Sequence, residues 1–217
     1  MSHELRTPMH GILSFAELGL KRLDTLSQEK LRQYLENIQL SGSRLLYLLN
    51  DLLDLAKLEA GKMKLDLSPV KLAELVEYCI KEQDLRLRWK NLACHFESGT
   101  DDTECVCDRN RIIQVLTNII ANAIRFSPEK GEIGIDLKRN KTGFKIRISD
   151  QGPGIPAAEL DQVFDKFYQS NVSRNQSGST GLGLAICREI IDLHQGRIWA
   201  EQNSQLGASI LFEIPAR

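Results

Sequence analysis

The chain has 217 residues, of which 42% are hydrophobic and 26% charged, so it can form one large or two small globular domains. Its net charge of -1, without a block of basic residues, offers no attraction for a nucleic acid backbone, and no nucleic acid partner is expected. Charged and polar residues interrupt its most apolar stretch, which falls short of a span of about 20 apolar residues, so this fragment is expected to make no membrane contact.

The first part of the chain predicts two helices joined as a hairpin. Ile12, Phe15 and Leu18 show helical periodicity, and Ser27 is a suitable N-cap for the next helix. In that second helix, apolar residues alternate in steps of four and three, which is typical of a coiled-coil seam. The seam consists of Leu31, Leu35, Ile38, Leu45, Leu49, Leu52 and Ala56, with Gly42 as its one gap.

A single hairpin is too thin to bury this apolar stripe. A homodimer would cover it by joining two hairpins into a four-helix bundle. The alternative is a hairpin that packs on the C-terminal domain of its own chain. A domain boundary is predicted near Gly61, which gives domains 1–64 and 65–217.

The second domain is predicted to have an α+β fold. Its expected elements are a short strand before residue 70, helices over 70–89, 108–125 and 182–194, strands over 92–97, 104–107, 132–139 and 144–150, and a hairpin over 197–214. Such a mixture of helices and mainly antiparallel strands favours an α/β sandwich.

The first helix opens with the sequence HELRTP, residues 3–8. Neutral imidazole can attack phosphorus, and Glu4 can accept the hydrogen of the other ring nitrogen of His3. Thr7 follows on the same helix face, where capping of the helix start is its alternative role, and Pro8 removes a helical hydrogen bond. The remaining histidines, His10, His95 and His194, are expected at the solvated surface.

Two asparagines, Asn118 and Asn122, lie four residues apart on one predicted helix, so their amides share a face. An amide oxygen is a suitable ligand for Mg²⁺. Taken alone, however, such a pair is also compatible with an ordinary wet helix face.

Asp150 ends a predicted strand just before Gly152 and Gly154. Its carboxylate can accept the exocyclic amino hydrogen of adenine, whereas the keto oxygen of guanine offers no such donor, so ATP is expected rather than GTP. The two glycines let a flat ring approach the backbone. The same pattern in isolation would indicate only a turn.

Gly181 and Gly183 start a helix after a loop rich in serine, glycine and threonine. Free N–H groups and the positive helix end are suited to phosphate oxygens. The loop over 165–180 is expected to be mobile without nucleotide. Phe164 and Phe167 would pack its base, and for Phe164 core packing alone is sufficient.

Five motifs, in their order along the chain, resemble the catalytic core of sensor histidine kinases of two-component signalling. They are HELRTP, NIIANA (118–123), DQGPGIP (150–156), VFDKFYQ (163–169) and GSTGLGLAI (178–186). The resemblance covers almost the whole chain. It implies a HisKA dimerisation and phosphoacceptor domain followed by a GHKL-type ATP-binding domain, with ATP and Mg²⁺ as cofactors.

The resemblance also implies a role for each matching residue. His3 is the phosphoacceptor, Glu4 orients it, Thr7 positions a water for dephosphorylation of the partner, and Asn118 lies near the transferred phosphoryl group. Asn122 is the magnesium ligand. The nucleotide-binding residues it implies are Asn118, Asn122, Arg125, Phe126, Asp150, Gly152, Gly154, Lys166, Thr180, Gly181, Leu182 and Gly183. Many relatives have an arginine where this chain has Gln169, and either Lys166 or Arg174 would supply that charge.

The implied activity is autophosphorylation of His3 and phosphotransfer to an aspartate of a response regulator receiver domain, with phosphatase activity left open. Two alternatives remain. One is a degenerate regulatory scaffold that dimerises and binds a partner without catalysis, against which the intact motifs count. The other is an ATP-hydrolysing relative such as gyrase, which carries a general-base glutamate where Asn118 stands. The chain is expected to be a cytoplasmic fragment of a longer protein that can carry a membrane anchor.

Overall fold

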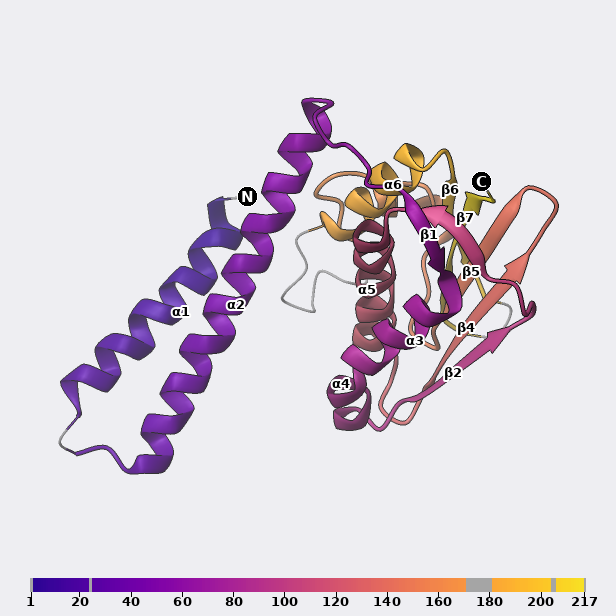
Figure 1. Cartoon of the computed structure of the whole chain (residues 1–217). Helices are drawn as coiled ribbons and strands as arrows, with labels where there is room; N and C mark the ends of the chain where they lie inside the picture. Colours follow the sequence, from indigo (N-terminus) through magenta and orange to yellow (C-terminus); the bar gives the residue numbers. More distant parts are fainter. Residues whose placement is uncertain (1, 24, 171–180, 204–205, 217) are drawn as a thin grey trace. The chain divides into compact units, whose positions relative to one another are not determined.

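The computed structural model describes residues 2–23, 25–170, 181–203 and 206–216, with the backbone alone for Ser2, His3, Glu4 and Glu59. The chain divides into two compact units, Met1–Lys62 and Met63–Arg217, each considered by itself below. The first is the helical hairpin, and the second holds all the strands (Figure 1). The sequence had placed the boundary two residues later, between residues 64 and 65.

The first unit consists of helices α1 (Ser2–Lys21) and α2 (Gln28–Glu59), which pack along each other (Figure 1). The predicted N-cap of α2 is present, because the Ser27 side chain accepts a hydrogen bond from the Lys30 N–H at 3.3 Å. Pro8 is buried within α1, which continues through it as a helix.

The inner face of the hairpin only partly coincides with the predicted seam. Leu48 of α2 is buried, whereas the seam residues Leu35 and Leu49 are 58% and 48% exposed. A long helix that is apolar on two sides can turn only one of them toward its hairpin partner. Other leucines of α2 therefore remain outside this contact.

The second unit contains a five-stranded sheet, a two-stranded sheet and the remaining helices. Its elements are β1 (Ser68–Lys71), α3 (Leu72–Glu82), α4 (Asp84–Trp89), β2 (Ala93–Ser98), β3 (Glu104–Cys107), α5 (Arg109–Phe126), β4 (Glu132–Arg139), β5 (Gly143–Ser149), the 3-10 helices η1 (Ala157–Glu159) and η2 (Gln162–Phe164), α6 (Gly183–Leu193), β6 (Arg197–Gln202) and β7 (Ala208–Pro215). The large sheet has the strand order β2-β4-β5-β7-β6, and β1 pairs with β3.

Only the β2–β4 pair of the large sheet is parallel, and the other pairs are antiparallel. Helices α3, α5 and α6 lie on one face of this sheet (Figure 1). The predicted α+β fold is therefore confirmed. The single helix expected over 70–89 instead breaks at Gln83, where α3 ends and α4 begins, and both Cys79 of α3 and Leu87 of α4 are buried.

The core of this unit lies between the sheet and the helices. Alternate residues of β4 and β5 are buried, as the period of two predicts for a sheet with one covered face. The largest of them are Ile133, Ile135, Leu137, Phe144, Ile146 and Ile148. Each such side chain contributes about 1.5–3 kcal/mol by burial, so the core holds the ends of α5, β5 and α6 firmly in place.

Candidate functional site

Helix α5 forms one wall of the candidate site, and its start is fixed by Asp108. The Asp108 side chain accepts hydrogen bonds from the N–H groups of Asn110 (3.0 Å) and Arg111 (3.1 Å), so Asp108 is the N-cap of α5. Two turns later, Asn118 is buried at 7% exposure, and Asn122 is half-buried one turn beyond it. Both asparagines thus lie on the part of α5 that is shielded from solvent.

The buried asparagine connects α5 to the start of α6. Its side-chain Nδ2 donates to the main-chain oxygen of Gly183 at 3.4 Å. A Cβ atom added to Gly183 would lie 3.7 Å from the amide of Asn118. Two motifs that are 65 residues apart in the sequence therefore meet at one point.

At the end of β5, Asp150 is held by backbone N–H groups. Its Oδ1 accepts hydrogen bonds from Gly152 N at 2.7 Å and from Ala208 N at 3.4 Å. Burial raises the pKa of this carboxyl above its ordinary value, and the two backbone hydrogen bonds oppose the rise. The carboxylate is therefore oriented and largely withdrawn from water.

Gly152 connects Asp150 to the end of α5. A Cβ atom at Gly152 would lie 2.8 Å from both Asp150 Oδ1 and the main-chain oxygen of Phe126. Only glycine permits this approach. The guanidinium of Arg125 lies 5.3 Å from the centre of the Phe126 ring, so these two predicted nucleotide residues stack on each other.

Sequence analysis missed two residues that support Asp150. The side chain of Asn203 donates to the main-chain oxygens of Asp150 (3.0 Å) and Ala208 (3.1 Å). Gly207 has φ of 89°, and a Cβ atom there would lie 1.8 Å from the Asp150 oxygen. The glycine in the predicted 197–214 hairpin was the available signal, but its partner is 57 positions away in the numbering and could not be identified from the pattern.

Phe167 and Tyr168 pack against Gly181. Gly181 has φ of 68°, and a Cβ atom there would lie 2.6 Å from the Tyr168 oxygen. The Phe167 N–H donates to the Gly181 oxygen at 2.9 Å. Phe164 is 2% exposed, which fits the core-packing role expected for it, whereas Phe167 is 43% exposed.

Other predicted residues of this region differ in their surroundings. Leu182 is 2% exposed, so its side chain is part of the core. Lys166 Nζ lies 3.8 Å from Glu189 Oε1 of α6. Thr180 and Arg174 lie outside the described residues.

On the first unit, His3 and Glu4 lie in the first turn of α1, and their side chains are outside the described part of the chain. Thr7 lies beyond the first turn of α1, so its alternative role in capping the helix start is wrong. His10 is exposed, as expected.

The expectation of a surface position for His194 is wrong, because this residue is 4% exposed. Its Nε2 accepts a hydrogen bond from the Asp108 N–H at 3.0 Å, and its Nδ1 lies 2.8 Å from the Ile190 oxygen. Asp108 Oδ2 also accepts a hydrogen bond from the Asp66 N–H at 2.9 Å. The histidine thus connects the end of α6 with the beginning of α5.

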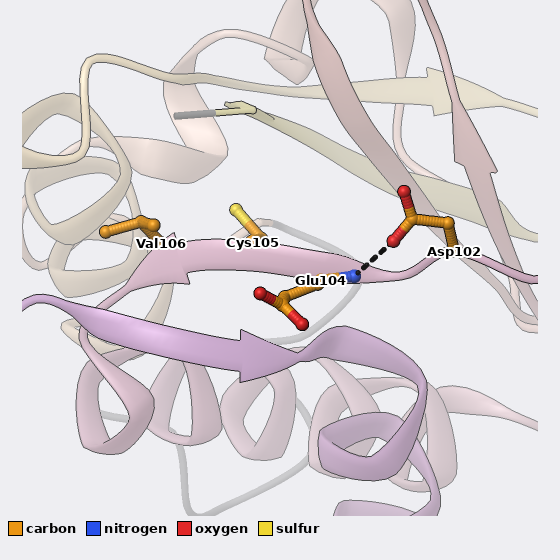
Figure 2. A pocket seen from close by; sticks show the side chains of 4 residues that line it. All are labelled: Asp102, Glu104, Cys105 and Val106. Atoms are coloured by element: carbon orange, nitrogen blue, oxygen red, sulfur yellow. Dashed lines mark hydrogen bonds between the residues drawn. The ribbon is translucent and has the colours of Figure 1, made fainter.

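A separate surface pocket adjoins β3 (Figure 2). It is lined by Asp102, Glu104, Cys105 and Val106, and Asp102 Oδ1 accepts a hydrogen bond from the Glu104 N–H at 3.2 Å. None of the predicted site residues lines it. Within the described ranges, no helix has the length and apolar character that a membrane span requires.

Two family models match the chain. Residues 1–61 match the His Kinase A (phospho-acceptor) domain, and residues 107–217 match the Histidine kinase-, DNA gyrase B-, and HSP90-like ATPase. The order of the two domains is the one that the sequence motifs predict.

Curated relatives are similar along nearly the whole chain. The circadian input-output histidine kinase CikA of Synechococcus elongatus is 34% identical over 99% of this chain and 29% of its own length. The sensor histidine kinase WalK of Bacillus subtilis is 32% identical over 99% of this chain and 35% of its own length. The chain therefore spans about a third of the length of these relatives.

Solved structures give the same result. Full-length ShkA in complex with AMPPNP has a TM-score of 0.77 and 28% identity, covering 99% of this chain and 44% of that one. Histidine kinase ThkA in complex with the response regulator protein TrrA has a TM-score of 0.75 and 29% identity, covering 100% of this chain and 60% of that one. The chain belongs to the sensor histidine kinases and contains their phospho-acceptor domain followed by their ATPase domain.

Proposed function

We propose that this chain uses ATP to phosphorylate His3 and then passes the phosphoryl group to an aspartate in the receiver domain of a response regulator. The observation that carries the proposal is the convergence of three motifs on α5. Asn118 meets Gly183 at the start of α6, and the Phe126 carbonyl meets Gly152 in the loop after Asp150. The residues expected to bind adenine and phosphate thus share one rigid wall.

In this proposal, Asp150 accepts the exocyclic amino hydrogen of adenine, and its fixed Oδ1 keeps the carboxylate in orientation. The phosphates lie toward Gly181 and Gly183, where the first N–H groups of α6 and its positive end favour anions. The amide oxygen of Asn122 would hold Mg²⁺, which would supply positive charge to neutralise the phosphate oxygens. No carboxylate cluster is needed for such a site.

Phosphoryl transfer depends mainly on positioning and charge neutralisation. A ring nitrogen of neutral His3 attacks the γ-phosphorus, a nitrogen–phosphorus bond forms, and the bond to the bridging oxygen breaks to release ADP. Glu4 accepts a hydrogen bond from the other ring nitrogen and stabilises the positive charge that forms on the ring. In the second reaction, the phosphoryl group moves from His3 to a carboxylate of the partner.

Two solved relatives support the choice of nucleotide and partner. ShkA was solved with AMPPNP, an ATP analogue, and ThkA with a response regulator. Hydrolysis of ATP by a general base is less well supported, because Asn118 cannot take a proton and its Nδ2 already donates to Gly183. We place the reaction in the cytoplasm, where ATP is available.

We further propose that the chain acts as a homodimer through its first unit. Leu46, Leu49 and Leu53 of α2 are 62%, 48% and 51% exposed, and Met9 and Leu13 of α1 are 50% and 57% exposed. The spacing of the α2 residues is that of a coiled-coil seam. A second hairpin would bury them in a four-helix bundle.

The experiment that tests the phosphorylation is incubation with ATP labelled at the γ-phosphate, followed by treatment of the protein with acid or base. Phosphohistidine contains a nitrogen–phosphorus bond, which acid hydrolyses and base leaves intact. We expect label that is lost in acid and kept in base. A label that resists acid would indicate a phosphorylated hydroxyl and contradict the proposal.

A further inference from the structure

We propose that Lys90 is a positioning residue for the nucleotide site and that its ammonium sets the affinity for ATP without touching it. The inference rests on the proposed function. Lys90 follows α4 and lies outside residues 107–217, which match the ATPase family model. Its side chain is partly buried against the end of α5.

The ammonium of Lys90 donates hydrogen bonds to three main-chain oxygens, those of Ile124 (2.9 Å), Arg125 (2.8 Å) and Ser127 (2.8 Å). A lysine has three N–H donors, so all of its capacity is directed to one helix end. The last four carbonyls of a helix have no intrahelical partner and carry its negative dipole end. Lys90 therefore acts as a cationic cap on α5.

The main chain of Lys90 is fixed as well. Its carbonyl accepts a hydrogen bond from the Lys130 N–H at 3.0 Å, and Gly131 accepts one from the Ala93 N–H at 3.0 Å. The turn after α5 is thus tied to the segment between α4 and β2. The ammonium consequently has a defined position relative to the carbonyls that it binds.

This helix end also supports the adenine side of the proposed site. The residue between the capped carbonyls, Phe126, presents its own carbonyl to Gly152, as described above. Just before Gly152, Gln151 Oε1 accepts a hydrogen bond from the Glu132 N–H at 3.0 Å. The loop that carries Asp150 is therefore packed against the segment that Lys90 fixes.

Removal of the ammonium would leave three carbonyls without their charged donor and let the end of α5 shift. Arg125, Phe126 and the loop after Asp150 would then lose their fixed relation. Because adenine is common to ATP and ADP, the affinity for both nucleotides should fall by the same factor. The ratio of affinities with and without Mg²⁺ should not change, since Asn122 lies one turn earlier.

The test is calorimetric titration of the whole chain with ATP and with ADP at a temperature well below the unfolding transition. Lys90→Met, which keeps the unbranched stem but removes the ammonium, should weaken both affinities about tenfold, or 1.4 kcal/mol. Lys81→Met, at an exposed lysine near the end of α3, should leave them unchanged. Lys90→Arg keeps the charge but cannot donate to three carbonyls from one nitrogen, so it should give an intermediate affinity.

A purely structural lysine would give a different result. Lys90→Met would then lower the melting temperature but bind both nucleotides like the parent at the lower temperature, which would overturn the inference. If Lys90→Met does not fold, an unchanged affinity in Lys90→Arg has the same meaning. A parent chain that binds no ATP would instead overturn the proposed function, and this inference with it.

Discussion

The side-chain amide of Asn118 donates to the main-chain oxygen of Gly183, with 3.4 Å between the two atoms. At this distance the hydrogen bond is a long one. This hydrogen bond matters for the geometry of the site, because it holds the middle of α5 against the first residue of α6. Asn122, one turn further along α5, is then placed on the same wall as the helix end proposed to bind phosphate.

Asn122→Ala is predicted to weaken ATP binding in the presence of Mg²⁺ and to leave binding without the metal nearly unchanged, because only the proposed metal ligand is lost. Asp150→Asn should instead weaken ATP and ADP alike under both conditions. Calorimetric titrations of both variants with ATP and with ADP, in the presence and absence of Mg²⁺, measure these affinities. If the parent binds ATP equally well with and without the metal, the role of Asn122 is wrong.

The two glycines around Leu182 should differ in their tolerance of alanine. Gly181→Ala places a Cβ atom at φ of 68° and within 2.6 Å of the Tyr168 oxygen, so it should destabilise the second unit by about 2 kcal/mol or more. Among the described residues, the Cβ atom of Gly183→Ala meets only the Asn118 amide, at 3.7 Å, and the alanine adds helix propensity. The melting temperature of this variant should equal or exceed that of the parent. Thermal unfolding without nucleotide measures both, and equal losses would contradict the close packing seen at Gly181.

Asp51 makes the stability of the hairpin depend on pH. Burial, and secondarily the charge of Asp54, raises the pKa of Asp51 from 3.8 to about 6. Between pH 3.8 and about pH 6 the folded state binds more protons than the unfolded state, so the free energy of unfolding falls as pH rises. Above about pH 6 the destabilisation by the buried Asp51 charge is fully present. Asp51→Asn should therefore stabilise the protein by about 2 kcal/mol more at pH 8 than at pH 4.5.

Glu36→Gln is the matched control for Asp51→Asn, because Glu36 is an exposed acid on the same helix. Its effect on the unfolding free energy should be smaller than that of Asp51→Asn, because an exposed side chain loses little water on folding. Urea unfolding followed by circular dichroism at the helix band gives these free energies. A gain from Asp51→Asn that does not depend on pH would show that burial of the charge is not the cause.

The exposed leucines of α2 lead to a prediction about the oligomeric state. Leu46→Asp combined with Leu53→Asp should convert a dimer to monomers whose second unit still binds ATP, because each buried leucine contributes about 1.5–3 kcal/mol to association. These residues are 62% and 51% exposed in the single chain, so the hairpin itself should tolerate the change better than at half-buried Leu45 or Leu52. Sedimentation velocity at micromolar concentration measures the state.

Leu85→Asp serves as the control for that experiment, because Leu85 is 82% exposed but lies on α4 of the second unit. This variant should remain a dimer. A parent chain that sediments as a monomer at micromolar concentration would contradict the proposed bundle.

Much of the fold could be predicted because its signals are local. The alternation over 132–139 corresponds to β4, and Asp108 before an apolar helix pattern marks the start of α5. The nucleotide motifs are also short runs of residues, which is why they could be recognised by resemblance to a family, and the roles of their residues stay predictions.

What the sequence did not reveal depends on contacts between remote residues. His194 was expected at the surface because its partner, the Asp108 N–H, is 86 residues away. The three carbonyls that Lys90 binds are 34 to 37 residues away and belong to the backbone, which leaves no trace in the residue pattern. Gly207 supports Asp150 in the same way. Which apolar side of α2 faces α1 is likewise a property of the packed hairpin.

The measurement that tests the central claim most directly is the labelling of two histidine variants with ATP labelled at the γ-phosphate. His3→Gln should abolish the acid-labile label while nucleotide affinity stays close to that of the parent, because the residues proposed to bind ATP lie on the other unit. His10→Gln, at an exposed histidine two turns later on the same helix, should be labelled like the parent. Label that persists in His3→Gln, or that disappears in His10→Gln alone, would contradict the assignment of His3 as the phosphoacceptor.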